Sequence, residues 1–294
     1  MLLREPDRSE RVELGLATLR LWSWGDPAAP AVLCLHGAFD HGRMWDGLAP
    51  QLAAQGFHVV APDLRGHGDS SRVSSGHVWE ASALDIALIA HRFGAVGLVG
   101  HSFGGGQALF VAAMWPELAR WVVNLDGLGP PASAFDADAD LVQASRDAFT
   151  ALDRLRRSPV RVYPTLDEAA ERRRRINVRL PEAWLDHLVR HGTRQVEGGV
   201  SWKADPMFNI GFPGDFDADT LLEQYALVEC PVLVLTGAEP DTWSDLTDDE
   251  IAMRVAALRA THHTVAGAGH YLHLERPDAV WEQMTSFLDT VDPR

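Results

Sequence analysis

The sequence predicts an α/β protein with a mostly parallel, doubly wound sheet and an inserted helical cap. Apolar runs typical of buried strands alternate with helical patterns on both sides of a long break, as in parallel sheets covered by helices on both faces. The break, residues 131–221, has helical patterns and many charges but no strand-like run. Single polar residues follow several predicted strands, where such sheets bind ligands. We therefore expect residues 1–130 and 222–294 to form the core and residues 131–221 to form the cap.

The first half of the chain contains five predicted strands. The first alternates loosely between apolar and polar residues, and the others are short apolar runs typical of buried strands. These strands cover residues 13–24, 31–35, 57–61, 97–100 and 121–125. Helical spacing predicts helices over residues 44–55, 81–93 and 107–114.

The second half resumes this alternation after the break. Strands are predicted over residues 232–235 and 264–265, and helices over residues 248–259 and 277–289. The last helix has Pro277 in its first turn, where proline is favoured. Within the break, helical patterns cover residues 137–155, 166–176 and 181–191.

Composition excludes several classes of protein. The chain has 294 residues and a formal net charge of -15, which argues against nucleic acid or an anionic membrane as a partner. It has no run of about 18 apolar residues and no apolar signal-peptide core near its start, so we expect no membrane association. Cys34 and Cys230 lie in apolar runs and indicate buried thiols, as in a reducing, cytoplasmic compartment. The sequence leaves the oligomeric state open.

The pattern Gly100-x-Ser102-x-Gly104 lies between a predicted strand and a predicted helix. A serine on such a sharp turn has a strained backbone and an exposed hydroxyl, and flanking glycines let the strand and helix pass closely. The helix that follows directs free N–H groups toward a developing oxyanion. We therefore predict that Ser102 is a nucleophile.

A serine nucleophile needs a base within hydrogen-bond reach. His270 follows the last predicted strand in a glycine-rich loop, which makes it the candidate. His273 is a nearby rival, three residues further on. His101 precedes the nucleophile, and because neighbours on a turn diverge, we expect its side chain to point away from the site.

The base in turn needs a carboxylate that holds its tautomer and stabilises the imidazolium. Asp126 follows the strand after the nucleophile, and Asp241 follows the next core strand. Either position can reach the same imidazole in a sheet of this kind, so the pattern leaves both as alternatives for the acid.

The loop after the strand at residues 31–35 is the predicted source of one oxyanion donor. It contains Ala38, whose backbone N–H we expect to act with that of Phe103, directly after the nucleophile. His36 in the same loop is interpreted as a structural hydrogen-bonding residue.

With these motifs in this order, the chain resembles the α/β-hydrolase superfamily. The matching segments are His36-Gly37, residues 63–70, residues 100–105 and Gly269-His270. The order of serine, aspartate and histidine is also that of the superfamily. More closely, residues 126–131, 163–170 and 203–206 resemble the serine-hydrolase-like branch of capped members.

This resemblance has consequences for the site. The branch carries an acidic residue at the position of Asp126, which favours Asp126 as the acid. The acid of many superfamily members lies where this chain has Pro240, one residue before Asp241, although a Gly-Ala-x-x-Asp form also exists. Epoxide hydrolases and haloalkane dehalogenases use an aspartate nucleophile, so Ser102 argues against both. The resemblance implies no cofactor.

The resulting functional hypothesis is a serine hydrolase that cleaves a carboxylic ester or lactone through an acyl-enzyme. The alternatives are a carbon–carbon bond hydrolase of the meta-cleavage type, an acyltransferase, and a non-catalytic ligand-binding protein on the same fold. We expect a small-molecule substrate, an apolar acyl compound.

The predicted cap offers two sets of residues for substrate binding. Its aromatic residues either line an apolar pocket or pack the cap onto the core; they are Tyr163, Trp184, Trp202, Phe208 and Phe212. Its four consecutive arginines, residues 172–175, cannot share one helix face, because neighbours diverge by about 100°. We expect three to be solvated, which leaves one as a candidate for binding a substrate carboxylate.

Overall fold

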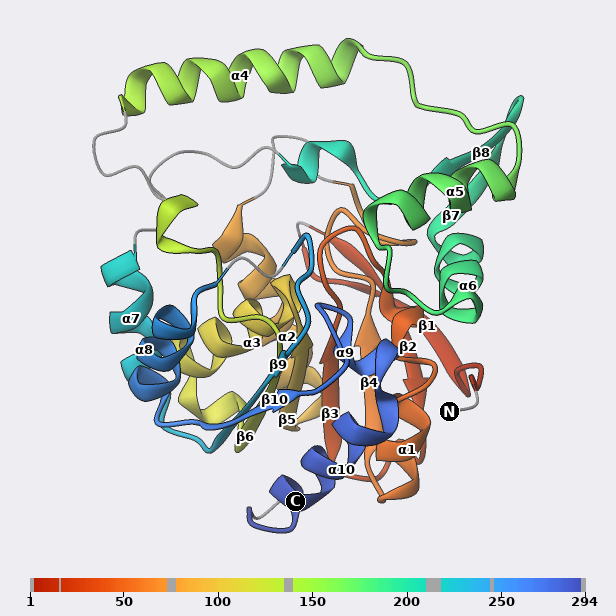
Figure 1. Cartoon of the computed structure of the whole chain (residues 1–294). Coiled ribbons are helices and arrows are strands. Elements are labelled where there is room, and N and C mark those ends of the chain that lie inside the picture. Colours follow the sequence, from red (N-terminus) through yellow and green to blue (C-terminus); the bar gives the residue numbers. More distant parts are fainter. Residues whose placement is uncertain are drawn as a thin grey trace.

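The computed structural model describes residues 3–15, 17–72, 78–134, 140–209, 218–243 and 246–291 (Figure 1). Phe212 and the beginning of the helix predicted from residue 137 lie outside these ranges. Within the described residues, no helix combines the length and apolar character that crossing a bilayer requires.

Eight strands of the described chain form one sheet in the order β1-β2-β4-β3-β5-β6-β9-β10. β1 and β2 pair antiparallel with each other and β2 with β4, and all later pairs are parallel. The strands are β1 (Arg8–Glu13), β2 (Thr18–Trp24), β3 (Ala31–Leu35), β4 (His58–Pro62), β5 (Ala95–His101), β6 (Trp121–Leu125), β9 (Val232–Gly237) and β10 (Thr261–Val265). The predicted mostly parallel α/β fold is confirmed.

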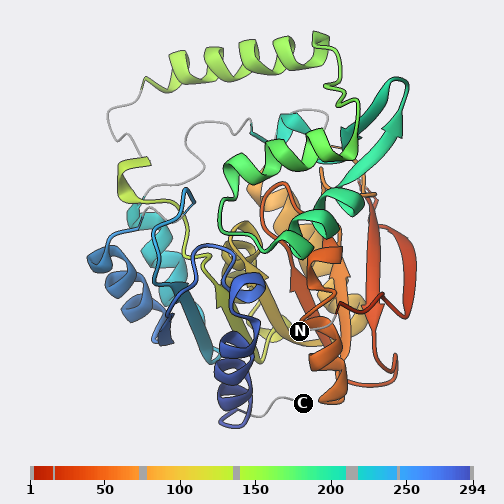
Figure 2. The same ribbon diagram turned by 45° about the vertical axis from the view of Figure 1, so that its right-hand side comes forward.

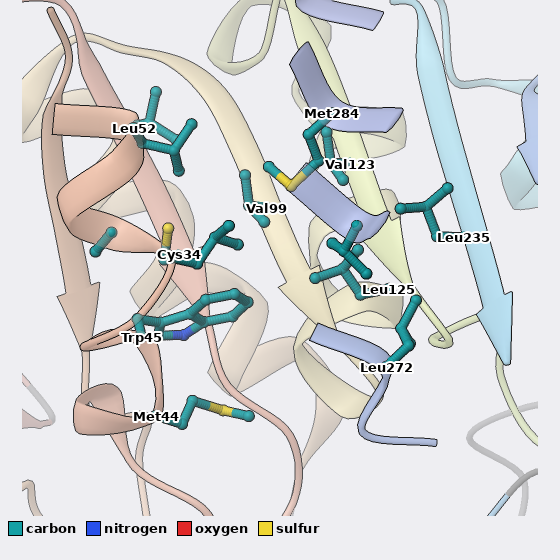
Figure 3. Close-up of a cluster of buried hydrophobic side chains, with 14 of the residues drawn as sticks. Cys34, Met44, Trp45, Leu52, Val99, Val123, Leu125, Leu235, Leu272 and Met284 are labelled. Carbon is teal, nitrogen blue, oxygen red and sulfur yellow. The ribbon is translucent and has the colours of Figure 1, made fainter. Parts of the chain in front are cut away.

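Alternation along the strands divides the core into two layers. In β3, Val32 and Cys34 face one apolar cluster, whereas Leu33 and Leu35 face another, because successive side chains point to opposite faces. Figure 3 shows the first cluster, in which Cys34 lies near Leu52 and Trp45.

Helices cover both faces. The face with Val32 packs against α1 (Ala49–Ala54), α9 (Leu272–Glu275) and α10 (Pro277–Leu288). The face with Leu33 packs against α2 (Trp79–Phe93), α3 (Phe103–Met114), α7 (Ala218–Ala226) and α8 (Asp248–Leu258). Short 3-10 turns are η1 (Gly42–Trp45), η2 (Pro116–Leu118) and η3 (Ala132–Ala134). This two-sided cover leaves the carboxyl ends of the parallel strands as the edge open to loops.

Between β6 and β9 the chain leaves the sheet. This part is called the insertion. It is taken as residues 131–217 rather than the predicted 131–221, because α7 packs on the core. Its elements are α4 (Leu141–Arg157), α5 (Leu166–Ile176), α6 (Glu182–Gly192), β7 (Thr193–Val196), β8 (Gly199–Trp202) and η4 (Pro206–Asn209). In Figures 1 and 2, α4 lies across the top of the molecule, at the end opposite the C-terminal helix α10.

Three local predictions were wrong. Residues 13–24 are not one strand, because the chain turns at Gly15 (φ 84°) between β1 and β2. The predicted helix over residues 44–55 is divided into η1 and α1. The insertion also contains strands, since β7 and β8 form an antiparallel hairpin. Glu197 and Gly198 form its two-residue turn, with Gly198 at a φ of 83°, and Gly199 begins β8.

Candidate active site

Ser102 occupies the sharp turn between β5 and α3. Its φ of 51° and ψ of -120° are unfavourable for a residue with a side chain. A Cβ atom on Gly100 would lie 2.3 Å from the carbonyl oxygen of Gly104, and one on Gly104 would lie 2.3 Å from that of Leu35. The two flanking glycines are therefore required by the close passage of strand and helix, as the spacing predicts.

The two candidate acids make different contacts with His270. The Nδ1 atom of His270 lies 2.6 Å from Oδ2 of Asp126, and both side chains are largely buried. Asp241 instead accepts a hydrogen bond from the backbone N–H of His270, at 3.3 Å. Because a carboxylate only accepts, Nδ1 carries the proton toward Asp126, and Nε2 is the basic nitrogen.

Each residue of this pair follows a strand of the sheet. Asp126 comes directly after β6 at a φ of 52°, and its backbone N–H donates to Leu235 of the neighbouring β9 at 2.8 Å. His270 follows β10 in the loop that leads to α9. Parallel strands thus bring together residues that are 144 positions apart in the chain.

The loop after β3 lies against the turn that carries Ser102. A Cβ atom on Gly37 would be 3.3 Å from the Cβ atom of Ser102. Ala38 follows and lines the same cavity as Ser102, and Phe39 has a φ of 65°. Phe103 is the first residue of α3, directly after Ser102. Both residues whose backbone N–H groups were predicted to face an oxyanion therefore border the nucleophile.

His36 holds this loop in place. Its Nδ1 donates to the carbonyl oxygen of Gly37 at 2.7 Å, and its Nε2 accepts from the backbone N–H of Leu64 at 2.9 Å. Burial lowers the pKa of His36 to about 4, so the ring is neutral. The predicted structural role of His36 is confirmed by these contacts.

His101 does not point away from the site, so that expectation was wrong. Its ring centroid is 4.7 Å from that of His270, and its Nε2 donates to the carbonyl oxygen of His270 at 2.9 Å. Strand β5 ends at His101, so its side chain lies at the same sheet edge as the loop that carries His270. His101 therefore supports the backbone of His270.

His273, the rival base, is buried in a stack of rings. Its ring centroid lies 5.1 Å from that of Trp45 and 4.7 Å from that of His101. Burial lowers its pKa to about 3, and neither ring nitrogen has a hydrogen-bond partner among the described residues. His273 is thus a packing residue in this structure.

Ser102 and His270 open onto a cavity of about 850 Å³, which is a volume typical of small-molecule sites. The insertion forms much of its wall. Of the aromatic residues proposed for a pocket, Tyr163 and Trp202 line it. Trp184 instead joins the core cluster, and Phe208 packs edge-on against Phe103 with ring centroids 5.0 Å apart.

A buried polar cluster that was not predicted from the sequence lies beside this cavity. Arg173 of α5 donates to Asp40 at 2.5 Å and to the hydroxyl of Tyr271 at 3.0 Å, and that hydroxyl donates to Asp40 at 2.9 Å. Burial opposes the charge of Arg173, but Asp40 and Tyr271 outweigh it and hold the pKa of Arg173 above its usual value. The cluster joins the insertion to the loop after β3 and to the neighbour of His270.

The spacing in the sequence places Arg173 on the same helix face as two alanines. Ala169 and Ala170 lie four and three positions earlier on the helix and are buried, so Arg173 shares their face. Arg174 and Arg175 instead pair with Glu171 on the exposed side. The buried arginine of the run therefore binds a carboxylate of this chain.

The described residues include no group of three or more histidine, cysteine, aspartate or glutamate side chains arranged to hold a metal ion. What the arrangement offers is a serine on a strained turn, an aspartate-bound imidazole and backbone N–H groups beside them. These are the parts of nucleophilic acyl transfer.

Comparison with known proteins gives consistent matches. The model described as "Alpha/beta hydrolase family" matches residues 32–283. The chain is 29% identical to a serine hydrolase-like protein of Danio rerio, over 96% of this chain and 89% of that protein. It is 28% identical to a 2-(acetamidomethylene)succinate hydrolase of Mesorhizobium japonicum, over 96% and 95% of the two chains. A solved thioesterase domain from the curacin biosynthetic pathway matches with a TM-score of 0.80 at 25% identity, over 95% of this chain and 98% of that one.

Proposed function

Because the chain belongs to the alpha/beta hydrolase family, we propose that it hydrolyses a carboxylic ester or lactone through an acyl-enzyme on Ser102. The contact that carries this proposal is the 2.6 Å hydrogen bond between His270 and Asp126, at a cavity that Ser102 shares. It supplies the oriented base that a serine hydroxyl needs at neutral pH.

In the first half-reaction, the Oγ atom of Ser102 attacks the carbonyl carbon of the substrate. Nε2 of His270 takes the hydroxyl proton, and Asp126 stabilises the imidazolium. The backbone N–H groups of Ala38 and Phe103 bind the oxyanion. When the tetrahedral intermediate collapses, the carbon–oxygen bond to the alcohol breaks and the imidazolium protonates the leaving oxygen.

In the second half-reaction, water attacks the acyl-enzyme. His270 takes a proton from the water, the same two N–H groups bind the second oxyanion, and the proton returns to Ser102 as the acid leaves. The insertion acts as the cap: its wall of the cavity selects the acyl or alcohol group. Asp126 is the proposed acid of the triad, because Asp241 contacts the backbone of His270 rather than its ring.

The test is hydrolysis of p-nitrophenyl esters of increasing acyl length by the native protein and by Ser102→Ala. We expect Ser102→Ala to lower kcat by at least about a thousand-fold, since the nucleophile is removed. A fluorophosphonate probe should label the native protein and not the variant, and circular dichroism of the variant checks that it is folded.

The other outcomes separate the alternatives. Turnover that persists in Ser102→Ala would contradict the proposed nucleophile. Labelling of Ser102 without hydrolysis of any ester would favour carbon–carbon bond hydrolysis, and a folded native protein that neither reacts nor turns over would favour a binding protein.

A further inference from the structure

Arginines gather around the cavity of an otherwise acidic protein. The chain has a formal net charge of -15. The cavity is nevertheless lined by five arginines and one aspartate, namely Arg72, Arg156, Arg161, Arg172, Arg173 and Asp205. A cleft of one sign concentrates ligands of the opposite sign, so this wall favours an anion.

Two of these arginines already have a carboxylate partner in the chain. Arg173 binds Asp40, as described above, and Arg72 lies 3.8 Å from Asp205. The remaining three, Arg156, Arg161 and Arg172, have no carboxylate of the described residues within 4.0 Å. They are called the arginine rim below.

The arginine rim lies at the mouth of the cavity. Its three side chains line the cavity and are also exposed to solvent. The guanidinium of Arg161 lies 5.0 Å from the ring centroid of Tyr163, a cation–π contact that holds it beside the wall. These three cations thus stand at the opening, while Ser102 and His270 lie within.

The contrast with neighbouring arginines argues against a role in solubility alone. On the same helix α5, Arg174 and Arg175 point outward and pair with Glu171, and Arg174 also reaches Glu182. Arg172 turns to the cavity without such a partner. A bound anion would supply the counterion that Arg156, Arg161 and Arg172 lack among the described residues.

We propose that the substrate is an acyl compound with an anionic group, a carboxylate or a phosphate, that the arginine rim binds while Ser102 attacks the carbonyl. The planar guanidinium binds either group through two parallel hydrogen bonds. This inference rests on the proposed function and adds a charge to the apolar acyl compound expected from the sequence.

The experiment compares substrates that differ in the charged group. The carboxylate pair is the mono-p-nitrophenyl ester of adipate and p-nitrophenyl hexanoate. The phosphate pair is hexanoyl coenzyme A and the hexanoyl thioester of N-acetylcysteamine. We expect a kcat/KM at least about ten-fold higher for the charged member of one pair, and that pair identifies the anion.

The variant Arg161→Gln with Arg172→Gln should lower this charged-to-neutral ratio by about ten-fold or more. Arg175→Gln is the matched control, because Arg175 is exposed on α5 and bound to Glu171 at 3.2 Å; it should keep the native ratio. Raising the salt concentration from 0.05 to 0.5 M should also reduce the native ratio, because screening acts on exposed charges.

Equal kcat/KM values within both pairs, or a ratio unchanged in the double variant, would overturn the inference while leaving hydrolysis at Ser102 intact. If no substrate is turned over, the proposed function fails separately. Calorimetry with Ser102→Ala then tests binding to the arginine rim. Binding of monomethyl adipate or coenzyme A that the double variant weakens supports the inference. No binding of either compound overturns it.

Discussion

The core and the insertion hold their functional residues in different ways. In the core, Ser102, Asp126 and His270 each follow a strand of one sheet, and strands such as β3, β5 and β6 are almost completely buried. In the insertion, the separate apolar cluster is small, and α4 has one buried residue among the described ones, Leu152. The proposed reacting groups therefore lie at the ends of paired strands, and the residues proposed for recognition do not.

The insertion is attached to the core by both apolar and polar contacts. Leu180, Trp184 and Leu188 do join the core cluster. Around them, hydrogen bonds and ion pairs cross the boundary: Arg173 to Asp40, Arg179 to Glu275, His187 to Asp46, His41 to the carbonyl of Leu188, and Lys203 to Asp69. Such polar contacts depend on geometry more than apolar burial does, because hydrogen bonds weaken steeply when they are misaligned.

The largest effect should come from the proposed acid in the core, Asp126. Asp126→Asn keeps a polar group of similar size but no longer fixes the proton on Nδ1 of His270, and we expect kcat to fall by about 10³–10⁴-fold. Asp241→Asn should stay within about ten-fold, because Asp241 contacts the backbone N–H of His270. Steady-state kinetics on a p-nitrophenyl ester measures both. A larger loss in Asp241→Asn would reverse the assignment.

The next effect should come from the boundary. Arg173→Met leaves the charge of Asp40 buried and unpaired, so we expect the free energy of unfolding to fall by about 3–5 kcal/mol. Combining it with Asp40→Leu removes both charges and should restore much of that stability. Urea unfolding measures the three variants, with Arg175→Met as an exposed control on the same helix. Additive losses in the double variant would show that the two charges act independently.

The smallest effect concerns buried histidines of the core. Burial lowers the pKa of His36 to about 4, below the value near 6.5 of an unfolded chain. Between these values the unfolded state binds the proton and the folded state does not, so stability falls as pH decreases from 6.5 to about 4. When the pH is lowered from 7 to 5, the titration of His36 alone should lower the free energy of unfolding by about 2 kcal/mol.

His36→Gln isolates this contribution. Its amide oxygen can accept from the backbone N–H of Leu64, as Nε2 of His36 does, and the amide does not titrate. Urea unfolding at pH 7 and pH 5 should give a smaller difference for the variant than for the native protein. An equal difference would mean that other groups, such as the buried His101 and His273, account for the acid sensitivity.

The buried strands and the turn at Ser102 could be predicted from the sequence, because local residue patterns determine them. Glycines fix the turn at Ser102, and apolar runs fix the buried strands. The choice between Asp126 and Asp241 required the positions of three neighbouring strand ends, which no local pattern contains. The role of Arg173 was harder still to predict, since its partners Asp40 and Tyr271 are 133 and 98 positions away in the chain. Its burial depends on how α5 packs on the core, and helix patterns leave that packing undetermined.

The neighbouring strands β6 and β9 are separated by about 100 residues of chain, with the whole insertion between them. Closing a loop of that length costs about 4 kcal/mol of entropy. At synthesis rates of about 5–20 residues per second, β6 leaves the ribosome on the order of 5–20 s before β9 does. β6 (Trp121–Leu125) pairs with β5 on one side, but until β9 emerges its other edge has no partner strand, and unpaired edges promote aggregation. The length of the insertion therefore sets how long this edge of β6 stays unpaired during synthesis.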